Sequence, residues 1–125
     1  MASDKALSWV FAEEFVEENE LLAQAREAAT DLGADPVSTG VGAALRLLAA
    51  TCGAKAVLEI GTGAGVSGLW LLQGMSPDGV LTTIDQEVEF HKHARRAFAA
   101  AGIASQRTRL IAGRALDVLP RMAAR

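Results

Sequence analysis

The chain has 125 residues, half of them apolar and 22% charged, which allows one small domain with a buried core and excludes a disordered chain. Twelve basic and fifteen acidic residues give a formal net charge of −3, which argues against a protein that binds nucleic acid by neutralising phosphates. The single cysteine, Cys52, excludes an internal disulfide framework and a cysteine-rich zinc site, and it fits a reducing cytoplasm.

The first third of the chain predicts two helices between about residue 8 and residue 32. Asn19 lies between them as the candidate cap of the second helix, and Gly33 follows as its C-terminal end. The apolar stripes of the two helices comprise Leu7, Val10, Phe11 and Phe15, and then Leu21, Leu22, Ala25, Ala28, Ala29 and Leu32. The five glutamates between residues 13 and 20 form either a solvated helix face or a surface for a basic partner.

A turn-rich connector over residues 35–40 leads to a helix over residues 41–51, whose core candidates are Leu45, Leu47 and Leu48. From residue 56 onward, short apolar strands alternate with helices. We expect strands over residues 56–60, 80–84 and 107–112, and helices over residues 66–74, 87–101 and 114–124, the last interrupted at Pro120. The first strand is apolar enough to be covered on both faces. This alternation predicts an α/β fold with a parallel sheet, in the order β-α-β-α-β-α after an N-terminal helical extension.

Residues 60–77 carry no formal charge over a length that is nominally enough to cross a bilayer. Five glycines interrupt this stretch, however, and Pro77 ends it, so that a membrane helix here would need partners that the chain lacks. We therefore expect a soluble, cytoplasmic protein.

A glycine-rich loop follows the first strand and precedes the next helix. It reads Gly61-Thr62-Gly63-Ala64-Gly65, and such glycines let the backbone approach a ligand with the helix N-terminus behind it. Asp85 ends the next strand 24 residues after Gly61, where a carboxylate can accept hydrogen bonds from ribose hydroxyls. The pattern therefore indicates a nucleotide site; the alternative is a glycine turn that binds nothing.

Residues 63–68 match the dinucleotide fingerprint G-x-G-x-x-G letter for letter. The strand ends at Ile60, however, so the first glycine of a fingerprint should be Gly61, and the third position then falls on Val66. This register disfavours a nucleotide-binding oxidoreductase.

Residues 59–65 instead resemble motif I of methyltransferases that use S-adenosylmethionine (SAM), E-x-G-x-G-x-G. With Pro36-Val37-Ser38, Ser67, Thr83-Ile84-Asp85 and Gly113-Arg114-Ala115-Leu116, the chain from about Leu21 onward resembles the small cation-dependent O-methyltransferases, above all those of actinobacteria. Catechol and caffeoyl-CoA O-methyltransferases belong to this family. The resemblance implies a Rossmann-like methyltransferase fold, with residues 1–35 as the N-terminal helical extension and residues 36–125 as the N-terminal part of the SAM-binding domain.

The resemblance also implies roles for nine residues around SAM. At the methionine end of SAM, Gly61 and Thr62 would line the cofactor with Gly63 beside them, and Glu59 would help to fix this end. Ser67 would bind the carboxylate of SAM, and Val37 would close over the cofactor. At the adenosine end, Asp85 would hold the ribose hydroxyls, Gln86 would flank the adenine and Ala115 would contact the adenine. Structural alternatives are a helix cap for Ser67 and Asp85, and simple packing for Val37 and Ala115.

The family further implies a divalent cation such as Mg²⁺, bound by carboxylates and an amide near a lysine, after a fourth strand. We identify no metal ligand and no catalytic base in this chain, and His91 and His93 do not share a helix face. Because the chain ends at Arg125, before such a strand, we expect a fragment with weak or absent activity. Residues 57–60 would then form an uncovered apolar edge; the alternative to a fragment is an association partner that covers this edge.

We therefore expect the cofactor-binding half of an O-methyltransferase, an enzyme that transfers a methyl group to a hydroxyl of a small molecule. We expect a homodimer that binds neither nucleic acid nor membrane. The alternative is a non-catalytic Rossmann-like module that acts by oligomerisation or partner binding, with its glutamate-rich N-terminal helices as the surface.

Overall fold

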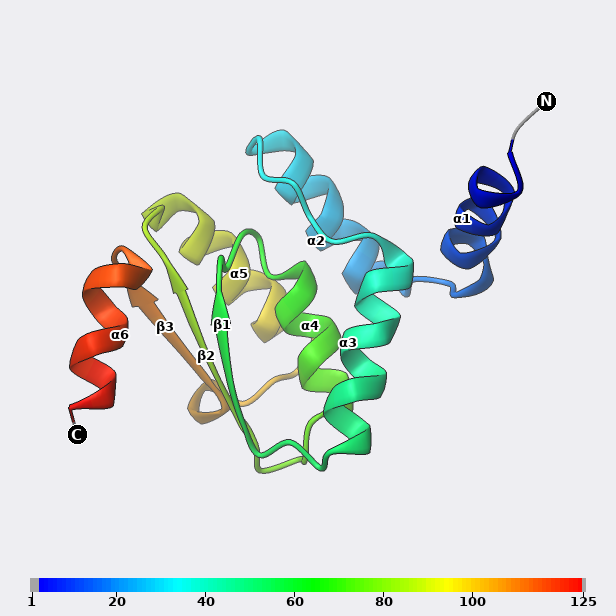
Figure 1. The fold of residues 1–125 in the computed structure, drawn as a ribbon. Helices are drawn as coiled ribbons and strands as arrows, with labels where there is room; N and C mark the ends of the chain where they lie inside the picture. The colour runs from blue at the N-terminus through cyan, green and yellow to red at the C-terminus, as the bar shows by residue number, and fades with distance from the viewer. Residues whose placement is uncertain (1–2, 125) are drawn as a thin grey trace.

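The structure, a computed structural model, describes residues 3–124 and is built on a parallel sheet of three strands (Figure 1). The strands lie side by side in the order β1 (Ala56–Ile60), β2 (Val80–Asp85) and β3 (Thr108–Ala112). The helices are α1 (Asp4–Phe15), α2 (Glu20–Asp31), α3 (Thr39–Thr51), α4 (Val66–Gly74), α5 (Val88–Ala100) and α6 (Ala115–Ala123), and a short 3-10 helix (Ser105–Arg107) precedes β3. The predicted α/β order is confirmed.

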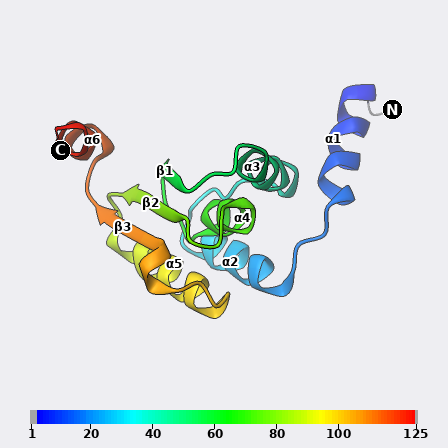
Figure 2. The same cartoon turned by 90° about the horizontal axis from the view of Figure 1, so that it is seen from below.

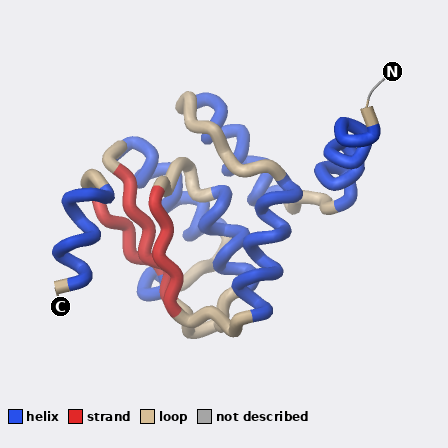
Figure 3. The backbone as a smooth tube through the Cα atoms, viewed as in Figure 1, coloured by secondary structure: helices blue, strands red, loops and turns tan. Residues whose placement is uncertain are grey.

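The helices are distributed unevenly about the sheet. Helices α2 to α5 lie on one side and α6 lies on the other (Figures 2 and 3). Helix α1 lies away from the sheet and contacts the start of α3, where Glu13 accepts a hydrogen bond from the N–H of Gly40. The β1–β2 register runs from Ala56 opposite Val80 to Ile60 opposite Ile84, and β3 continues it with Ala112 opposite Asp85. All three strands therefore end at the same edge of the sheet, which is where ligands bind in open α/β folds.

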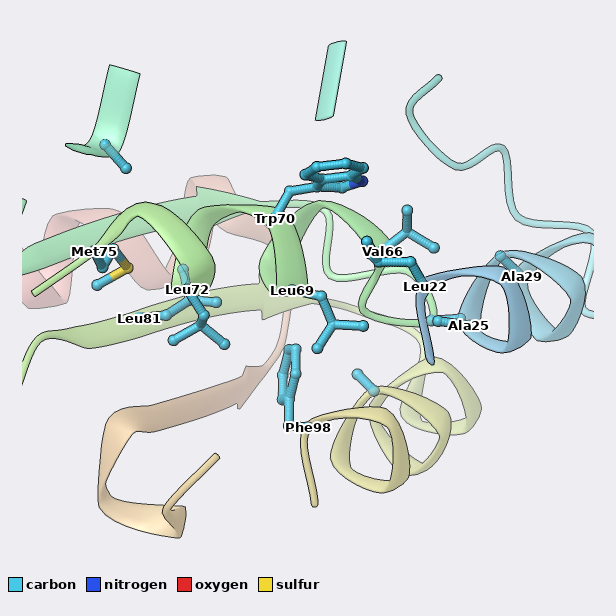
Figure 4. Packing of buried hydrophobic residues seen from close by; sticks show 13 residues of the cluster. Leu22, Ala25, Ala29, Val66, Leu69, Trp70, Leu72, Met75, Leu81 and Phe98 are labelled. Atoms are coloured by element: carbon cyan, nitrogen blue, oxygen red, sulfur yellow. The ribbon is translucent and has the colours of Figure 1, made fainter. Parts of the chain in front are cut away.

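The core lies between the sheet and helices α2, α4 and α5. Trp70 on α4 is fully buried, in one cluster with Leu22 from α2, Leu81 from β2 and Phe98 from α5 (Figure 4). Because α4 is enclosed between the sheet and other helices, its sequence is apolar on nearly all sides instead of on one stripe.

Helix α3 packs closely on α4 through small residues, so the prediction that Leu47 and Leu48 lie in the core is wrong. Their side chains are 65% and 64% exposed. The buried residues of α3 are Gly42 and Ala49, because only small side chains allow the two backbones to come this close. Leu45 is partly buried.

Strand β1 lies at the edge of the sheet, as expected. The expectation that both its faces are covered is wrong, because every second residue of β1 is exposed and one face is therefore uncovered. Leu58 and Ile60 are 48% and 60% exposed, because they point away from the helices α2 to α5. The predicted interruption at Pro120 is also wrong. Pro120 lies inside α6, which continues past it to Ala123.

The N-terminal region contains the two predicted helices, but α1 begins at Asp4 instead of residue 8, because the Ser3 side chain caps it. The Asn19 cap and the Gly33 terminus of α2 are confirmed, the latter with a left-handed φ of 75°. The apolar stripe of α1 is exposed, with no buried residue in the helix. No helix within residues 3–124 is long and apolar enough to cross a membrane.

Gly42→Ala tests the close packing of α3 on α4. A Cβ at Gly42 would lie 2.3 Å from Nε1 of the fully buried Trp70, which has no room to move aside. We expect the free energy of unfolding, measured with urea, to fall by about 3 kcal/mol. At Gly40 the close neighbour of a Cβ is the flexible end of Glu13, and the Ala12 oxygen lies at an ordinary 3.6 Å. Gly40→Ala is therefore the matched control and should lie within about 0.5 kcal/mol of the parent. Equal stability of the two variants would contradict this packing.

Candidate cofactor-binding site

The turn from β1 into α4 is made of residues 61–65 and depends on left-handed glycines. The φ angles of Gly61, Gly63 and Gly65 are 93°, 53° and 96°, a region that residues with a side chain rarely adopt. A Cβ at Gly61 or Gly63 would meet nothing within 4 Å, so the loop leaves open space above the sheet edge. This space lies at the N-terminus of α4, whose first N–H groups favour anionic groups.

Asp85 ties this loop to the start of α5. Its Oδ2 accepts a hydrogen bond from the N–H of Gly63 at 3.1 Å, and its Oδ1 accepts one from the N–H of Glu87 at 3.0 Å. The structural alternative for Asp85, a contact at the start of α5, is thus present. Each carboxylate oxygen keeps a further lone pair, so Asp85 can also accept hydrogen bonds from two ligand hydroxyls.

Glu59 is the centre of a hydrogen-bond network beneath the loop. Its Oε1 accepts a hydrogen bond from the Thr83 hydroxyl at 2.7 Å, and its Oε2 accepts one from Ser67 at 2.5 Å. Burial raises the pKa of the Glu59 carboxyl above its ordinary value of 4.5, the hydrogen bonds from Ser67 and Thr83 lower this pKa, and the charge of Asp85 raises it. Ser67 is not the cap of α4, since Gly65 occupies that position.

Two cavities meet at Gly61, and together they contain eight of the nine predicted SAM-binding residues. A cavity of about 280 Å³ is lined by Gly61, Asp85, Gln86 and Ala115, and a smaller one of about 90 Å³ is lined by Val37, Gly61, Thr62, Gly63 and Ser67. The ninth residue, Glu59, lines neither cavity but contacts Ser67. Both cavities therefore lie at the carboxyl edge of the sheet and share Gly61 as a lining residue.

Some residues at this site were not singled out as binding residues by the sequence. Leu116 is 76% exposed and lines the larger cavity beside Ala115. Thr83 was noticed only as part of a motif, yet it is the buried partner of Glu59. Residues of a strand alternate between its two faces, so the sequence already indicated that Thr83 lies on the same face of β2 as Asp85.

Groups that could bind a metal ion are sparse within residues 3–124. No three His, Cys, Asp or Glu side chains in this part of the chain lie together so that they could hold one. His91 is buried in α5 whereas His93 is more exposed, so the prediction that they do not share a face is confirmed. The described residues therefore do not fit a metal centre, and the divalent cation stays an expectation from the family.

Comparison with known proteins assigns the family. The sequence profile of the O-methyltransferase family matches residues 12–125, so the chain belongs to this family. One relative is a Mycobacterium tuberculosis protein that is named as an O-methyltransferase. It is 62% identical to this chain over 115 residues, which cover 92% of this chain and 51% of that protein.

Solved structures of O-methyltransferases share the fold. TomG from Streptomyces achromogenes, in complex with SAM, is 36% identical with a TM-score of 0.83, covering 97% of this chain and 56% of TomG. A Bacillus cereus O-methyltransferase in complex with S-adenosylhomocysteine (SAH) is 27% identical, also with a TM-score of 0.83, covering 96% of this chain and 55% of that one. The chain spans about half the length of the curated relatives that it matches.

Glu59→Gln tests the buried carboxyl. Because the pKa of Glu59 is raised in the folded protein, its contribution to stability is present below pH 4.5 and is lost as the pH rises through the raised pKa. We expect the free energy of unfolding of the parent, measured relative to that of the variant, to fall as the pH rises above 4.5. The exposed Glu89, whose pKa is lowered by Lys92, is the control. Above pH 4.5, the free energy of unfolding of Glu89→Gln should change with pH as that of the parent does. If the parent and Glu59→Gln showed the same change with pH, the raised pKa of Glu59 would be contradicted.

Proposed function

We propose that this chain is the cofactor-binding part of a SAM-dependent O-methyltransferase, with SAM lying along the carboxyl edge of the sheet. The main support for this proposal is the pair of cavities that share Gly61 as a lining residue. Each cavity would hold one end of the cofactor. Residues 36–125 would form this part, and residues 1–35 a helical extension. The acceptor would be a small molecule with a hydroxyl group.

The larger cavity suits the adenosine end. Asp85 is only partly buried there, and its carboxylate can hold the two ribose hydroxyls while it keeps its contacts with Gly63 and Glu87. Gln86 and Ala115 line the same cavity, where they would flank the adenine. The exposed apolar side chain of Leu116 adds a surface on which a flat ring can pack.

The smaller cavity suits the methionine end. Val37 from the connector before α3 faces the glycine loop across it, while Ser67 contributes from α4. Backbone N–H groups at the start of α4 would favour the carboxylate of the cofactor. When bound, SAM supplies an electrophilic methyl group on a sulfonium, and the role of these residues is to hold and orient the cofactor.

Calorimetric titration with SAH tests this proposal, with NAD as the control ligand. We expect micromolar binding of SAH and none of NAD. Asp85→Asn should weaken SAH binding at least about tenfold, because hydrogen bonds to a charged acceptor are lost. Asp78→Asn in the exposed turn before β2 is the matched control and should leave the affinity unchanged. Absence of SAH binding by the parent chain would contradict the proposal.

We also propose that the protein is a cytoplasmic homodimer. Its support is the exposed apolar surface on α1, which comprises Leu7, Trp9, Val10, Phe11 and Phe15, and on α3, which comprises Val41, Leu47 and Leu48. An isolated helix of this length is marginal in water, so α1 needs a surface to cover it. A second copy offers the same apolar surface in return, which suits a two-fold interface. The free, exposed Cys52 fits a reducing compartment.

Sedimentation equilibrium tests the dimer. We expect the parent to sediment as a dimer at micromolar concentration and Phe11→Asp to sediment as a monomer, since a charge would be buried in the interface. Val88→Asp on α5 replaces another exposed apolar residue, outside this surface, and should leave the dimer intact. A monomeric parent, or a dimeric Phe11→Asp variant, would argue against this interface.

A further inference from the structure

A further cavity lies between helices α2 and α5. The two helices lie side by side on one face of the sheet (Figure 2), and the groove between them, called here the α2/α5 groove, has a volume of about 190 Å³. Its apolar lining comes from Leu21, Ala25 and Ala28 on α2 and from Ala97 and Ala100 on α5. Because most of these side chains are small, the two helices leave room between them for an apolar group.

The polar rim of the α2/α5 groove is basic on the α5 side. Arg96 and His93 line the groove from α5, and Gln24 lines it from α2. Within residues 3–124 the Arg96 side chain forms no hydrogen bond or ion pair, whereas Lys92 on the same helix is paired with Glu89 at 2.7 Å. The described residues that line the groove include no Asp or Glu. The groove therefore attracts a negatively charged group.

The combination of an apolar lining with one cationic rim suits a small monocarboxylate. A guanidinium binds a carboxylate through two parallel N–H···O hydrogen bonds, and His93 keeps at least one ring N–H donor in either protonation state. Burial of an apolar body against the alanines adds affinity with each methylene group. A phosphate would bring a second negative charge that one arginine does not balance.

Ala64 forms a wall between the α2/α5 groove and the candidate cofactor site. It is 2% exposed, and it lines both this groove and the smaller cavity at the sheet edge. The next residue, Gly65, lies against α5, since a Cβ there would be 3.2 Å from the Cα of Ala94. An apolar group in the groove therefore contacts the loop over residues 61–65 from the side opposite the smaller cavity.

We propose that the α2/α5 groove binds a small carboxylate with an apolar body, and that this ligand supports the glycine-rich loop and strengthens cofactor binding. The carboxylate pairs with Arg96, and the apolar body lies between Ala28 and Ala97, against Ala64. A loop that such contacts already hold loses less conformational freedom when the cofactor binds. The carboxylate site is independent of the function proposed above, whereas its effect on the cofactor rests on that function.

Titration of the isotope-labelled chain with hexanoate, followed by nuclear magnetic resonance, tests the carboxylate site. We expect saturable shifts of the backbone amides of Ala25, Ala28 and Ala97, with a millimolar dissociation constant. Acetate lacks the apolar body and hexylamine carries the opposite charge, so each should bind at least about tenfold more weakly than hexanoate.

Two pairs of variants test the two parts of the site. Arg96→Gln removes the cation and should weaken hexanoate binding about tenfold, whereas Arg95→Gln, an exposed neighbour that does not line the groove, should bind as the parent does. Ala28→Leu fills the groove and should abolish binding. Ala23→Leu places the same side chain at an exposed position of α2 outside the groove and should leave binding unchanged.

Calorimetric titration of SAH in saturating hexanoate tests the effect on the loop. We expect SAH to bind about fivefold more tightly than in acetate of equal concentration, and by linkage SAH should strengthen hexanoate binding by the same factor. Arg96→Gln should bind SAH as the parent does in acetate and should show no gain in hexanoate.

The outcomes separate the carboxylate site from the function proposed above. Absence of hexanoate binding, or equal binding by the parent and Arg96→Gln, overturns the carboxylate site. An SAH affinity that is the same in hexanoate and in acetate overturns the support of the loop. If the parent binds hexanoate but no SAH, the proposed function and the effect on the cofactor are overturned together, while the carboxylate site is supported.

Discussion

The turn between β1 and α4 is the constraint on which the rest of the structure depends. The chain must reverse direction within residues 61–65 so that α4 can lie back on the sheet, and it does so with left-handed glycines. This turn places Ser67 over Glu59, and it presents the N–H of Gly63 to Asp85. The core around Trp70 and the cavities at the sheet edge both follow from this path.

The site combines a strong hydrogen-bond network with a cost in stability. Glu59 is held by Thr83 and Ser67, yet burial raises its pKa, so the ionised form is less favourable in the folded protein than in water. Such a cost is common where a buried charge serves a ligand.

Local signals in the sequence predicted the strand and helix order, the glycine loop and the position of Asp85 at the end of β2 correctly, because each depends on its own neighbours along the chain. The burial of individual side chains was predicted less well. Leu47 and Leu48 are exposed because the contact of α3 with α4 needs the small Gly42, a preference that only the partner Trp70 reveals. In the same way, the buried hydroxyl of Thr83 depends on the carboxylate of Glu59, 24 residues away in the chain, as its hydrogen-bond acceptor.

The central claim is that the cofactor lies along the carboxyl edge of the sheet. Nuclear magnetic resonance spectra of the labelled chain, recorded while SAH is added, test it residue by residue. The account predicts shifts of the backbone amides of Gly63, Gln86 and Ala115. It predicts none at Gly53 or Gly102, which follow α3 and α5 at the opposite edge of the sheet. Shifts confined to the groove between α2 and α5, or no shifts at saturating SAH, would contradict it.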